Sequence, residues 1–221
     1  MDCVDRYKII REKVPAGVKI VAVSKTKPAS SIVQLYSASR QKIFGENKAQ
    51  ELNQKYSLLP KDIEWHFIGH LQTNKIKFIA PYVSLIQSVD SFKLLVEINK
   101  EAKKLDRVIP YLLQFHIATE ESKYGFSVEE AISMLEDPKF QELSNVLPCG
   151  VMGMATFTED QMLIRKEFKL LNSYFTTLKS SFFLHNKGFC EISMGMSDDY
   201  ELAIDEGSTI VRIGSGIFGG R

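Results

Sequence analysis

The sequence predicts an α/β protein, a single-domain (β/α)8 barrel of the TIM-like kind over residues 1–221. Eight β-favouring segments alternate with helical segments along the chain, a pattern typical of parallel strands. The units are of even length, and no long linker, repeat or low-complexity tract separates them. An open doubly wound sheet is the alternative, but no GxGxxG motif follows the first strand, which favours the barrel.

The predicted strands are short runs rich in Val, Ile and Phe, bounded by Gly, Pro, Asn or Asp. In chain order they are 20–25 (IVAVSK), 42–46 (KIFGE), 64–69 (EWHFIG), 85–90 (LIQSVD), 111–117 (YLLQFHI), a strand within 147–155 (LPCGVMGMA), 189–195 (FCEISMG) and 209–214 (TIVRIG).

The predicted helices carry periodic apolar residues, and several start after a serine that can cap the first turn. In chain order they cover 1–12, a segment from Ser30 or Ser31, 47–56, 74–82, 91–105, 127–135, 160–180 and 198–206. The longest, 160–180, is expected to pack with Met162, Leu163, Phe168, Leu171 and Phe175 on one side.

Composition excludes several classes of protein. The 221 residues are 44% hydrophobic and carry a formal net charge of +1, so no global field attracts nucleic acid or an anionic membrane. The charged start MDCVDRYK is unlike a signal peptide, and no apolar run is long enough to span a bilayer. Three cysteines without a CxxC pair argue for a reducing compartment and against a disulfide framework or zinc site. A cytoplasmic protein is expected.

Candidate functional residues gather where the strands end, which is the side of a β/α barrel that carries its site. We expect no metal there, because His66 and His70 lie across a strand and a turn and lack partners. The candidates are Lys25, Asn47, Ser193, Ser197, Arg212, Gly214 and Ser215.

Lys25 is the most unusual of these residues. Strand side chains alternate, so Lys25 is expected to share a face with Val21 and Val23. A cation ending an apolar face is costly unless it is paired or neutral, and a neutral amine attacks carbonyl groups. We therefore expect a buried, reactive amine. The alternative is a phosphate-binding or ion-paired lysine that does not react.

The end of the chain predicts an anion site. IGSGIFGG at 213–220 is a glycine-rich turn leading into a short helix, to which Ser193, Ser197 and Ser215 add hydroxyl donors. The alternative is a tight chain terminus with serine caps. Arg212 shares a face with Ile210 and Gly214, and if that face is inward it must meet an acceptor. A bound ring or phosphate would be such an acceptor. The alternative is an ion pair with Glu191.

Several motifs together resemble the pyridoxal phosphate homeostasis proteins, whose barrel is similar to the N-terminal domain of alanine racemase. The resemblance covers the chain from residue 20 onward. The motifs are AVSKTKP at 22–28, FGENKAQE at 44–51, WHFIGHLQTNK at 65–75, SVDS at 88–91, SKYGF at 122–126, VMGMA at 151–155, SMGMSDDYELAIDEG at 193–207 and VRIGSGIFGGR at 211–221.

The resemblance implies a role for each candidate. Lys25 would carry pyridoxal 5′-phosphate, a vitamin B6 cofactor, as a Schiff base, and Arg212 would face its pyridine nitrogen. Asn47 would lie near the ring, and Ser193, Gly214 and Ser215 would hold the phosphate. Lys123 is a candidate second lysine for attachment of the cofactor. The chain departs from the family pattern at Phe115-His116, beneath the cofactor, and at Lys48 after GEN.

The implied function is binding and delivery of the cofactor without evident catalysis, by a monomer that serves pyridoxal phosphate-dependent apoenzymes. An arginine at the pyridine nitrogen weakens the ring as an electron sink. A racemase of this fold also takes a tyrosine base from a second domain, which is not expected here. The alternatives are an amino-acid racemase or lyase using Lys25 and, less favoured, a barrel aldolase without cofactor.

Overall fold

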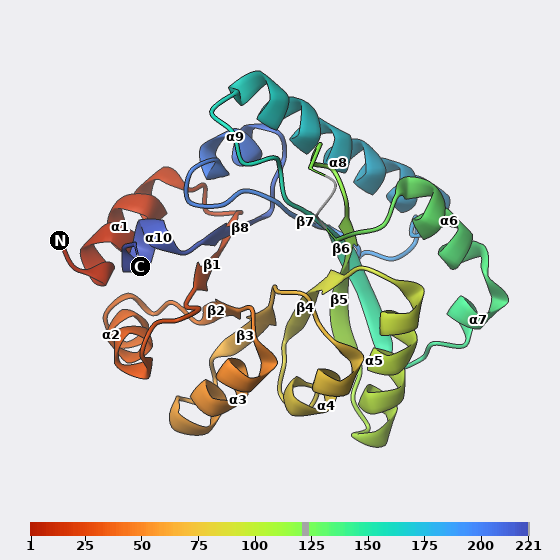
Figure 1. Ribbon diagram of the computed structural model, residues 1–221, viewed down its shortest axis with the longest axis horizontal. Coiled ribbons are helices and arrows are strands. Elements are labelled where there is room, and N and C mark those ends of the chain that lie inside the picture. The colour runs from red at the N-terminus through yellow and green to blue at the C-terminus, as the bar shows by residue number, and fades with distance from the viewer. Residues whose placement is uncertain (121–123, 221) are drawn as a thin grey trace.

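The computed structural model describes residues 1–120 and 124–220, and its eight parallel strands close into a barrel in sequence order (Figure 1). The strands are β1 (Lys19–Val23), β2 (Ile43–Glu46), β3 (Glu64–Phe67), β4 (Leu85–Val89), β5 (Ile109–Phe115), β6 (Val146–Gly153), β7 (Glu191–Ser193) and β8 (Ile210–Ile213). Closure is made by β1 and β8, where Lys19 pairs with Ile210 and Ala22 with Ile213. The predicted barrel is confirmed, and the open sheet is wrong.

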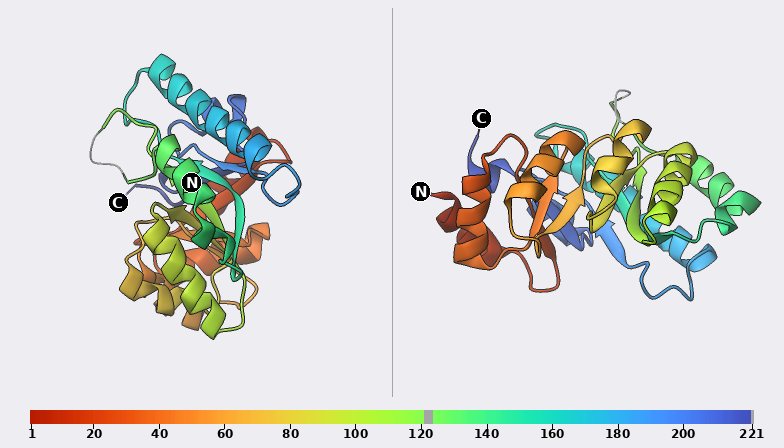
Figure 2. Two further views of the ribbon diagram at one scale, coloured as in Figure 1. Left: turned by 90° about the vertical axis from the view of Figure 1, so that its right-hand side faces the viewer. Right: turned by 90° about the horizontal axis from the view of Figure 1, so that it is seen from below.

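Helices surround the barrel, with α8 on one side and α5 on the other in a view turned by 90° (Figure 2). The helices are α1 (Cys3–Lys13), α2 (Ala29–Ser39), α3 (Ala49–Leu58), the 3-10 turn η1 (Thr73–Lys75), α4 (Ile76–Ile79), α5 (Phe92–Lys104), α6 (Val128–Glu136), α7 (Pro138–Gln141), α8 (Gln161–Ser181), α9 (Tyr200–Asp205) and α10 (Ser215–Phe218). The sequence did not predict α7, a single turn that Asp137 caps by accepting from the Lys139 N–H.

Strand β1 is shorter than predicted, and this changes the position of Lys25. The Ser24 N–H still donates to the Gly45 carbonyl over 3.0 Å, but the chain then leaves the sheet. Thr26 has a φ of +65°, in the left-handed region that a β-branched residue rarely adopts. Lys25 therefore lies in a turn after the strand, not on the strand.

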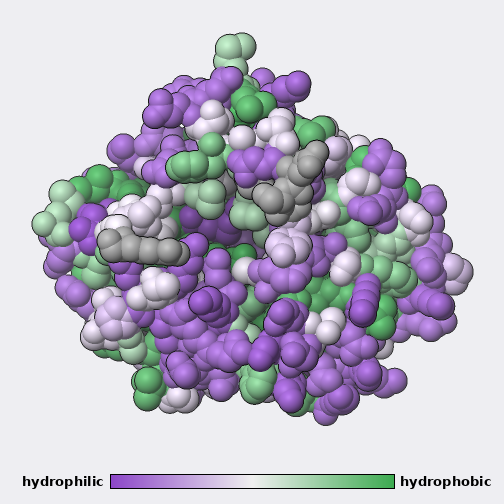
Figure 3. Space-filling model, viewed as in Figure 1, coloured by the Kyte–Doolittle hydropathy of each residue, from purple (hydrophilic) through white to green (hydrophobic). Residues whose placement is uncertain are grey.

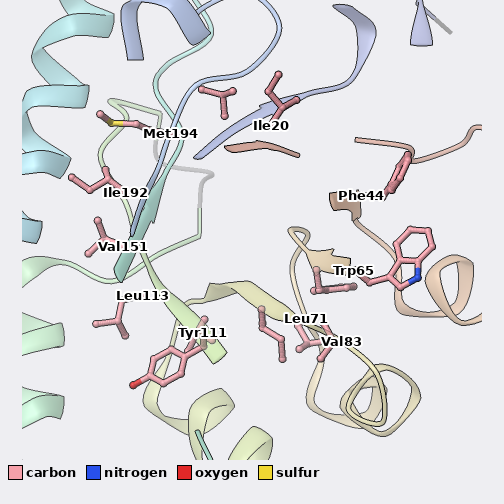
Figure 4. Close-up of a cluster of buried hydrophobic side chains, with 14 of the residues drawn as sticks. Ile20, Phe44, Trp65, Leu71, Val83, Tyr111, Leu113, Val151, Ile192 and Met194 are labelled. Atoms are coloured by element: carbon pink, nitrogen blue, oxygen red, sulfur yellow. The ribbon is translucent and has the colours of Figure 1, made fainter. Parts of the chain in front are cut away.

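A large apolar core fills the space between the strands and the helices. Trp65 and Phe44 come from neighbouring strands and point to the same side, with ring centroids 6.0 Å apart (Figure 4). Both are fully buried, as is Tyr111, which lies on the outer face of β5. Burying rings of this size contributes much of the apolar area that holds helices to a barrel.

A second, smaller core fills the barrel interior. Val21 and Val23 of β1, Leu112 of β5, Met152 of β6 and Ile210 of β8 form this buried cluster. The predicted alternation is thereby confirmed for β1 and β8: Val21, Val23 and Ile210 face inward, whereas Val211 and Ile213 join the outer core.

The long helix α8 packs on the core through Phe168, Leu171 and Phe175, as predicted, but not through Met162. Its buried residues are Ile164, Glu167, Phe168, Leu171 and Leu178, and Met162 is 84% exposed. Glu167 is buried because it binds the loops above β5 and β6: its Oε2 accepts from the Thr156 N–H over 2.7 Å, and its Oε1 accepts from the Thr119 N–H.

The two ends of the described chain lie together at one side of the barrel (Figure 1). Arg6 of α1 donates from Nε to the Ile217 carbonyl of α10 over 2.7 Å, which fixes the last helix against the first. Hydrophilic residues dominate the face seen in Figure 3. Within residues 1–120 and 124–220, no helix combines the length and the apolar character needed to cross a membrane.

Candidate functional site

A cavity of about 730 Å³ opens at the ends of β1, β2, β3, β6, β7 and β8. This volume is in the range of pockets that hold small molecules. Six of the seven candidate residues line it, namely Lys25, Asn47, Ser197, Arg212, Gly214 and Ser215. Residues from opposite ends of the chain therefore meet at the predicted end of the barrel.

Lys25 lines this cavity but is exposed, so the predicted burial of its amine is wrong. The physical reason is the early end of β1, because alternation with Val21 and Val23 no longer applies once the chain turns. The turn is closed by a hydrogen bond from the Lys27 N–H to the Ser24 carbonyl, 3.0 Å long. The side chain of Lys25 thus approaches the cavity from its rim.

Arg212 faces inward and is 4% exposed. It donates from Nη1 to Ser193 Oγ over 2.7 Å and from Nη2 to the Gly153 carbonyl over 2.9 Å. The predicted alternative, an ion pair with Glu191, is wrong, because Glu191 binds Lys19 at the opposite end of the barrel. Burial lowers the pKa of Arg212 to about 10. This value is still well above 7, so the guanidinium is charged at neutral pH.

A line of hydrogen bonds runs from Arg212 across the barrel interior. Ser193 of β7 accepts from Arg212 and donates to Gln87 Oε1 over 2.7 Å. Gln87 of β4 then lies with its Nε2 at 2.9 Å from His66 Nδ1 on β3. Burial lowers the pKa of His66 to about 3, so its imidazole is neutral and Nδ1 accepts. Each donor in the line points away from Arg212.

Ser193 is the candidate that the structure places away from the cavity wall. It is fully buried, and its hydroxyl binds Arg212 and Gln87. Its expected contact with a phosphate is therefore not supported, because its oxygen lies among interior groups in the layer of Arg212. The sequence indicated a hydroxyl near the site but not its depth.

The turn at the end of β8 lines the cavity with Gly214 and Ser215, and Ser197 lies beside it. Ser197 Oγ accepts from the Gly214 N–H over 3.2 Å and from the Gly216 N–H over 3.1 Å. Ser215 begins α10, and the first N–H groups of a helix have no acceptor within it. Lys27 donates to the carbonyls of Gly219 and Gly220 and so holds this segment at the rim.

Asn47 offers an unused polar atom. Its Oδ1 is buried and has no hydrogen-bond partner in the part of the chain that the structure describes. Gly69 keeps the Asn47 main chain in place, since a Cβ at residue 69 would lie 2.3 Å from the Asn47 carbonyl oxygen. This close approach of β2 and β3 requires glycine.

Sequence reasoning assigned no role at the site to Gln87, His66 and Gly69. The signal for the first two was available, because Gln87 alternates with inward Leu85, and His66 with Ile68, which packs on the interior core. A polar residue at an inward strand position needs a partner. Nothing in the local sequence named that partner, which comes from another strand.

Other predicted features lie outside the site or outside the described residues. Lys123 belongs to residues 121–123, which the structure does not describe. Phe115 packs on Tyr174 outside the barrel, and His116 binds the Glu120 carbonyl through Nε2 over 2.8 Å without lining the cavity. Among the described His, Cys, Asp and Glu residues, no group of three is arranged to hold a metal ion.

Comparison with known proteins identifies the family. A family model described as "Alanine racemase, N-terminal domain" matches residues 4–221. The chain is 39% identical over 204 residues to the pyridoxal phosphate homeostasis protein of Aquifex aeolicus, covering 92% of this chain and 87% of that protein. The structure of PipY from Synechococcus elongatus without pyridoxal phosphate superposes with a TM-score of 0.91, at 31% identity over 99% of this chain and 100% of that chain.

A second PipY structure, with pyridoxal phosphate bound, has a TM-score of 0.88 at the same identity and coverage. The fold and the cavity thus define a barrel of the alanine racemase N-terminal domain family. Within it, the chain belongs to the family of pyridoxal phosphate homeostasis proteins, as the sequence motifs predicted. The curated relatives carry the name of a homeostasis protein and not that of an enzyme.

Proposed function

We propose that this chain holds pyridoxal 5′-phosphate as a Schiff base on Lys25 and serves in its homeostasis and delivery, without evident catalysis. The observation that carries the proposal is that a buried arginine with neutral partners and an accessible primary amine share one cavity. Arg212 and Lys25 both line it, and the partners of Arg212 within the described residues are Ser193 and a carbonyl.

The residues present fit the three functional groups of this cofactor. Arg212 has five N–H donors, and the described residues accept from two of them, so it has donors for a pyridine nitrogen. The turn from Gly214 to Ser215 and the Ser197 hydroxyl would hold the phosphate at the start of α10. The orphaned Oδ1 of Asn47 would face the ring substituents.

When bound, pyridoxal phosphate supplies an aldehyde that condenses with a primary amine and releases water. Lys25 provides the amine at the rim, where solvent can take up that water. Arg212, charged at neutral pH, would donate to the ring nitrogen and hold it unprotonated. An unprotonated ring is a poor electron sink, which supports storage over turnover.

In this proposal residues 1–221 act as one cofactor-binding domain. The protein works as a monomer in the cytoplasm and passes the cofactor to pyridoxal phosphate-dependent apoenzymes. Free cysteines Cys3, Cys149 and Cys190 support a reducing compartment. The named relatives support the role in homeostasis. Size-exclusion chromatography with light scattering tests the monomer, and a dimer contradicts it.

Reduction with borohydride followed by peptide mapping tests the site. Protein loaded with pyridoxal phosphate should be yellow and carry the reduced label on Lys25, and Lys25→Ala should lose both band and label. Lys48→Ala is the matched control, because Lys48 is exposed and does not line the cavity. A label confined to another lysine contradicts the assignment. Rapid racemisation or lysis of an amino acid would instead favour the enzyme alternative.

A further inference from the structure

The backbone around Lys25 is held more firmly than its side chain. No described residue binds the Lys25 amine, which stands exposed at the rim. The turn from Ser24 to Lys27, in contrast, is closed by a main-chain hydrogen bond, and its third residue, Thr26, is held at a φ of +65°. Such a backbone conformation persists only where the surroundings hold it.

Helix α3 supplies those surroundings on both sides of Lys25. On one side, Glu51 Oε1 accepts from the Thr26 N–H over 2.6 Å. On the other side, Lys55 Nζ donates to the Ser24 carbonyl over 2.8 Å. Glu51 and Lys55 also form an ion pair over 2.7 Å. This pair therefore binds the main chain on both sides of Lys25, at Ser24 and at Thr26.

Lys55 of this ion pair also binds a buried carboxylate of β2, that of Glu46. Lys55 is 6% exposed, and its third bond, 2.7 Å long, goes to Oε1 of the fully buried Glu46. The Ser24 hydroxyl donates to the same Oε1 over 2.6 Å. Lys55 thus uses all three ammonium protons, on Ser24, Glu46 and Glu51.

This network lies behind the turn and not in the cavity. Glu46, Glu51 and Lys55 are absent from the cavity wall, and α3 packs on the outside of β2 (Figure 1). Buried ion pairs contribute little net stability compared with apolar residues of equal volume. Lys55 and Glu46 are buried, and Lys55 uses all three of its N–H donors on Ser24, Glu46 and Glu51. A charged group that is bound in this way behind the turn, and that does not line the cavity, therefore calls for a role in fixing geometry.

We propose that Glu51 and Lys55 are positioning residues: together with Glu46, which binds Lys55, they hold the turn around Lys25 in the conformation from which the Lys25 amine attacks the cofactor aldehyde. The inference rests on the proposed attachment at Lys25. In this inference α3 affects the rate at which the cofactor attaches covalently to Lys25. It does not affect the non-covalent affinity of the cavity for the ligand. Small displacements of a reacting group slow a reaction strongly, by up to about 100-fold for 1 Å.

The test compares attachment with binding. Stopped-flow absorbance gives the rate of Schiff-base formation with pyridoxal phosphate, and calorimetry gives the affinity for pyridoxine 5′-phosphate, which has no aldehyde. Lys55→Met and Glu51→Ala should form the Schiff base about 10- to 100-fold more slowly. Both should bind pyridoxine 5′-phosphate as the wild type does. Glu51→Gln should stay within about 3-fold, because its amide oxygen still accepts from the Thr26 N–H.

Lys19→Met is the matched control, since Lys19 is an ion-paired lysine at the other end of β1. Glu51→Ala keeps the Glu46–Lys55 pair and so remains informative if Lys55→Met does not fold. Wild-type attachment rates in Glu51→Ala overturn the inference, as does an equal loss of pyridoxine 5′-phosphate binding. Wild-type protein that never labels at Lys25 overturns the proposed function, and this inference with it.

Discussion

Arg212 and Ser193 meet inside the barrel, where the arginine Nη1 donates to the serine Oγ over 2.7 Å. Ser193 in turn donates to Gln87, and Gln87 donates to His66. The guanidinium is therefore bound by a line of neutral hydrogen-bonding groups. No carboxylate takes part in this line. The positive charge of Arg212 is therefore left for whatever ligand occupies the cavity.

The first prediction concerns the charge of Arg212. Arg212→Gln should shift the absorption band of the bound cofactor while weakening attachment only a few-fold, because Lys25 makes the covalent bond. Arg212→Glu should shift it further, since a carboxylate favours a protonated ring nitrogen. Absorbance spectra and titrations with pyridoxal phosphate measure the two effects. An unchanged band in both variants would remove Arg212 from the ring nitrogen.

The second prediction concerns the support of that arginine. Ser193→Ala leaves Gln87 Oε1 and one Arg212 N–H without a partner in a buried setting. An unsatisfied buried group costs about 1–3 kcal/mol, so the free energy of unfolding should fall by that amount in urea titrations. Ser57→Ala, at an exposed serine, should change it by less than about 0.5 kcal/mol. Equal effects at the two serines would contradict the interior line.

The third prediction concerns pH. Burial lowers the pKa of His66 from 6.5 to about 3, so between these values the unfolded chain binds a proton that the folded chain does not. Stability is therefore fully present above about pH 6.5 and falls as the pH is lowered toward 3. Between pH 7.5 and 5.5 the wild type should lose about 1.4 kcal/mol more than His66→Asn, which keeps an acceptor for Gln87.

Urea titrations at the two pH values measure this difference. His185→Gln is the control, because His185 is exposed and belongs to no part of the interior line. Parallel losses in the wild type and His66→Asn would mean that His66 is not buried as a neutral imidazole.

The fold was predictable from short-range signals. Runs rich in β-branched residues marked all eight strands, and alternation along β8 placed Arg212 on one face with Ile210. The structure shows that this face is the inward one. The same rule failed at Lys25, because it assumes that the strand continues, whereas β1 ends at Val23. Local sequence does not show the contact that holds the turn after the strand, here the bond from the Thr26 N–H to Glu51 of α3.

The sequence predicted which residues belong to the site, but not how deep in the barrel each of them lies. The line from Arg212 to His66 joins β8, β7, β4 and β3, and which inward residues share a level depends on the stagger of the barrel strands. Ser193 was therefore predicted at the phosphate, one layer above its actual place. The short helix α7 was missed because four residues carry no detectable periodicity.

The fourth prediction concerns the contact between β2 and β3. Gly69→Ala would put a Cβ 2.3 Å from the Asn47 carbonyl oxygen and 2.7 Å from its Cα, and main chain cannot move aside as a side-chain end can. We expect about 2–4 kcal/mol of destabilisation in urea. The control is Gly17→Ala, where no heavy atom lies within 4 Å of the added carbon. A neutral Gly69→Ala would mean that Asn47 is not held in this way.

The fifth prediction separates the phosphate from the rest of the cofactor. Ser197→Ala removes the acceptor of the Gly214 and Gly216 N–H groups, and so loosens the turn that starts α10. Because that turn faces the phosphate in the proposed arrangement, affinity for pyridoxal phosphate should fall about 10-fold, the effect of one charge-assisted hydrogen bond. Binding of pyridoxal, which has no phosphate, should not change. Fluorescence titrations with both ligands give the comparison, and an equal loss for pyridoxal would place the phosphate elsewhere in the cavity.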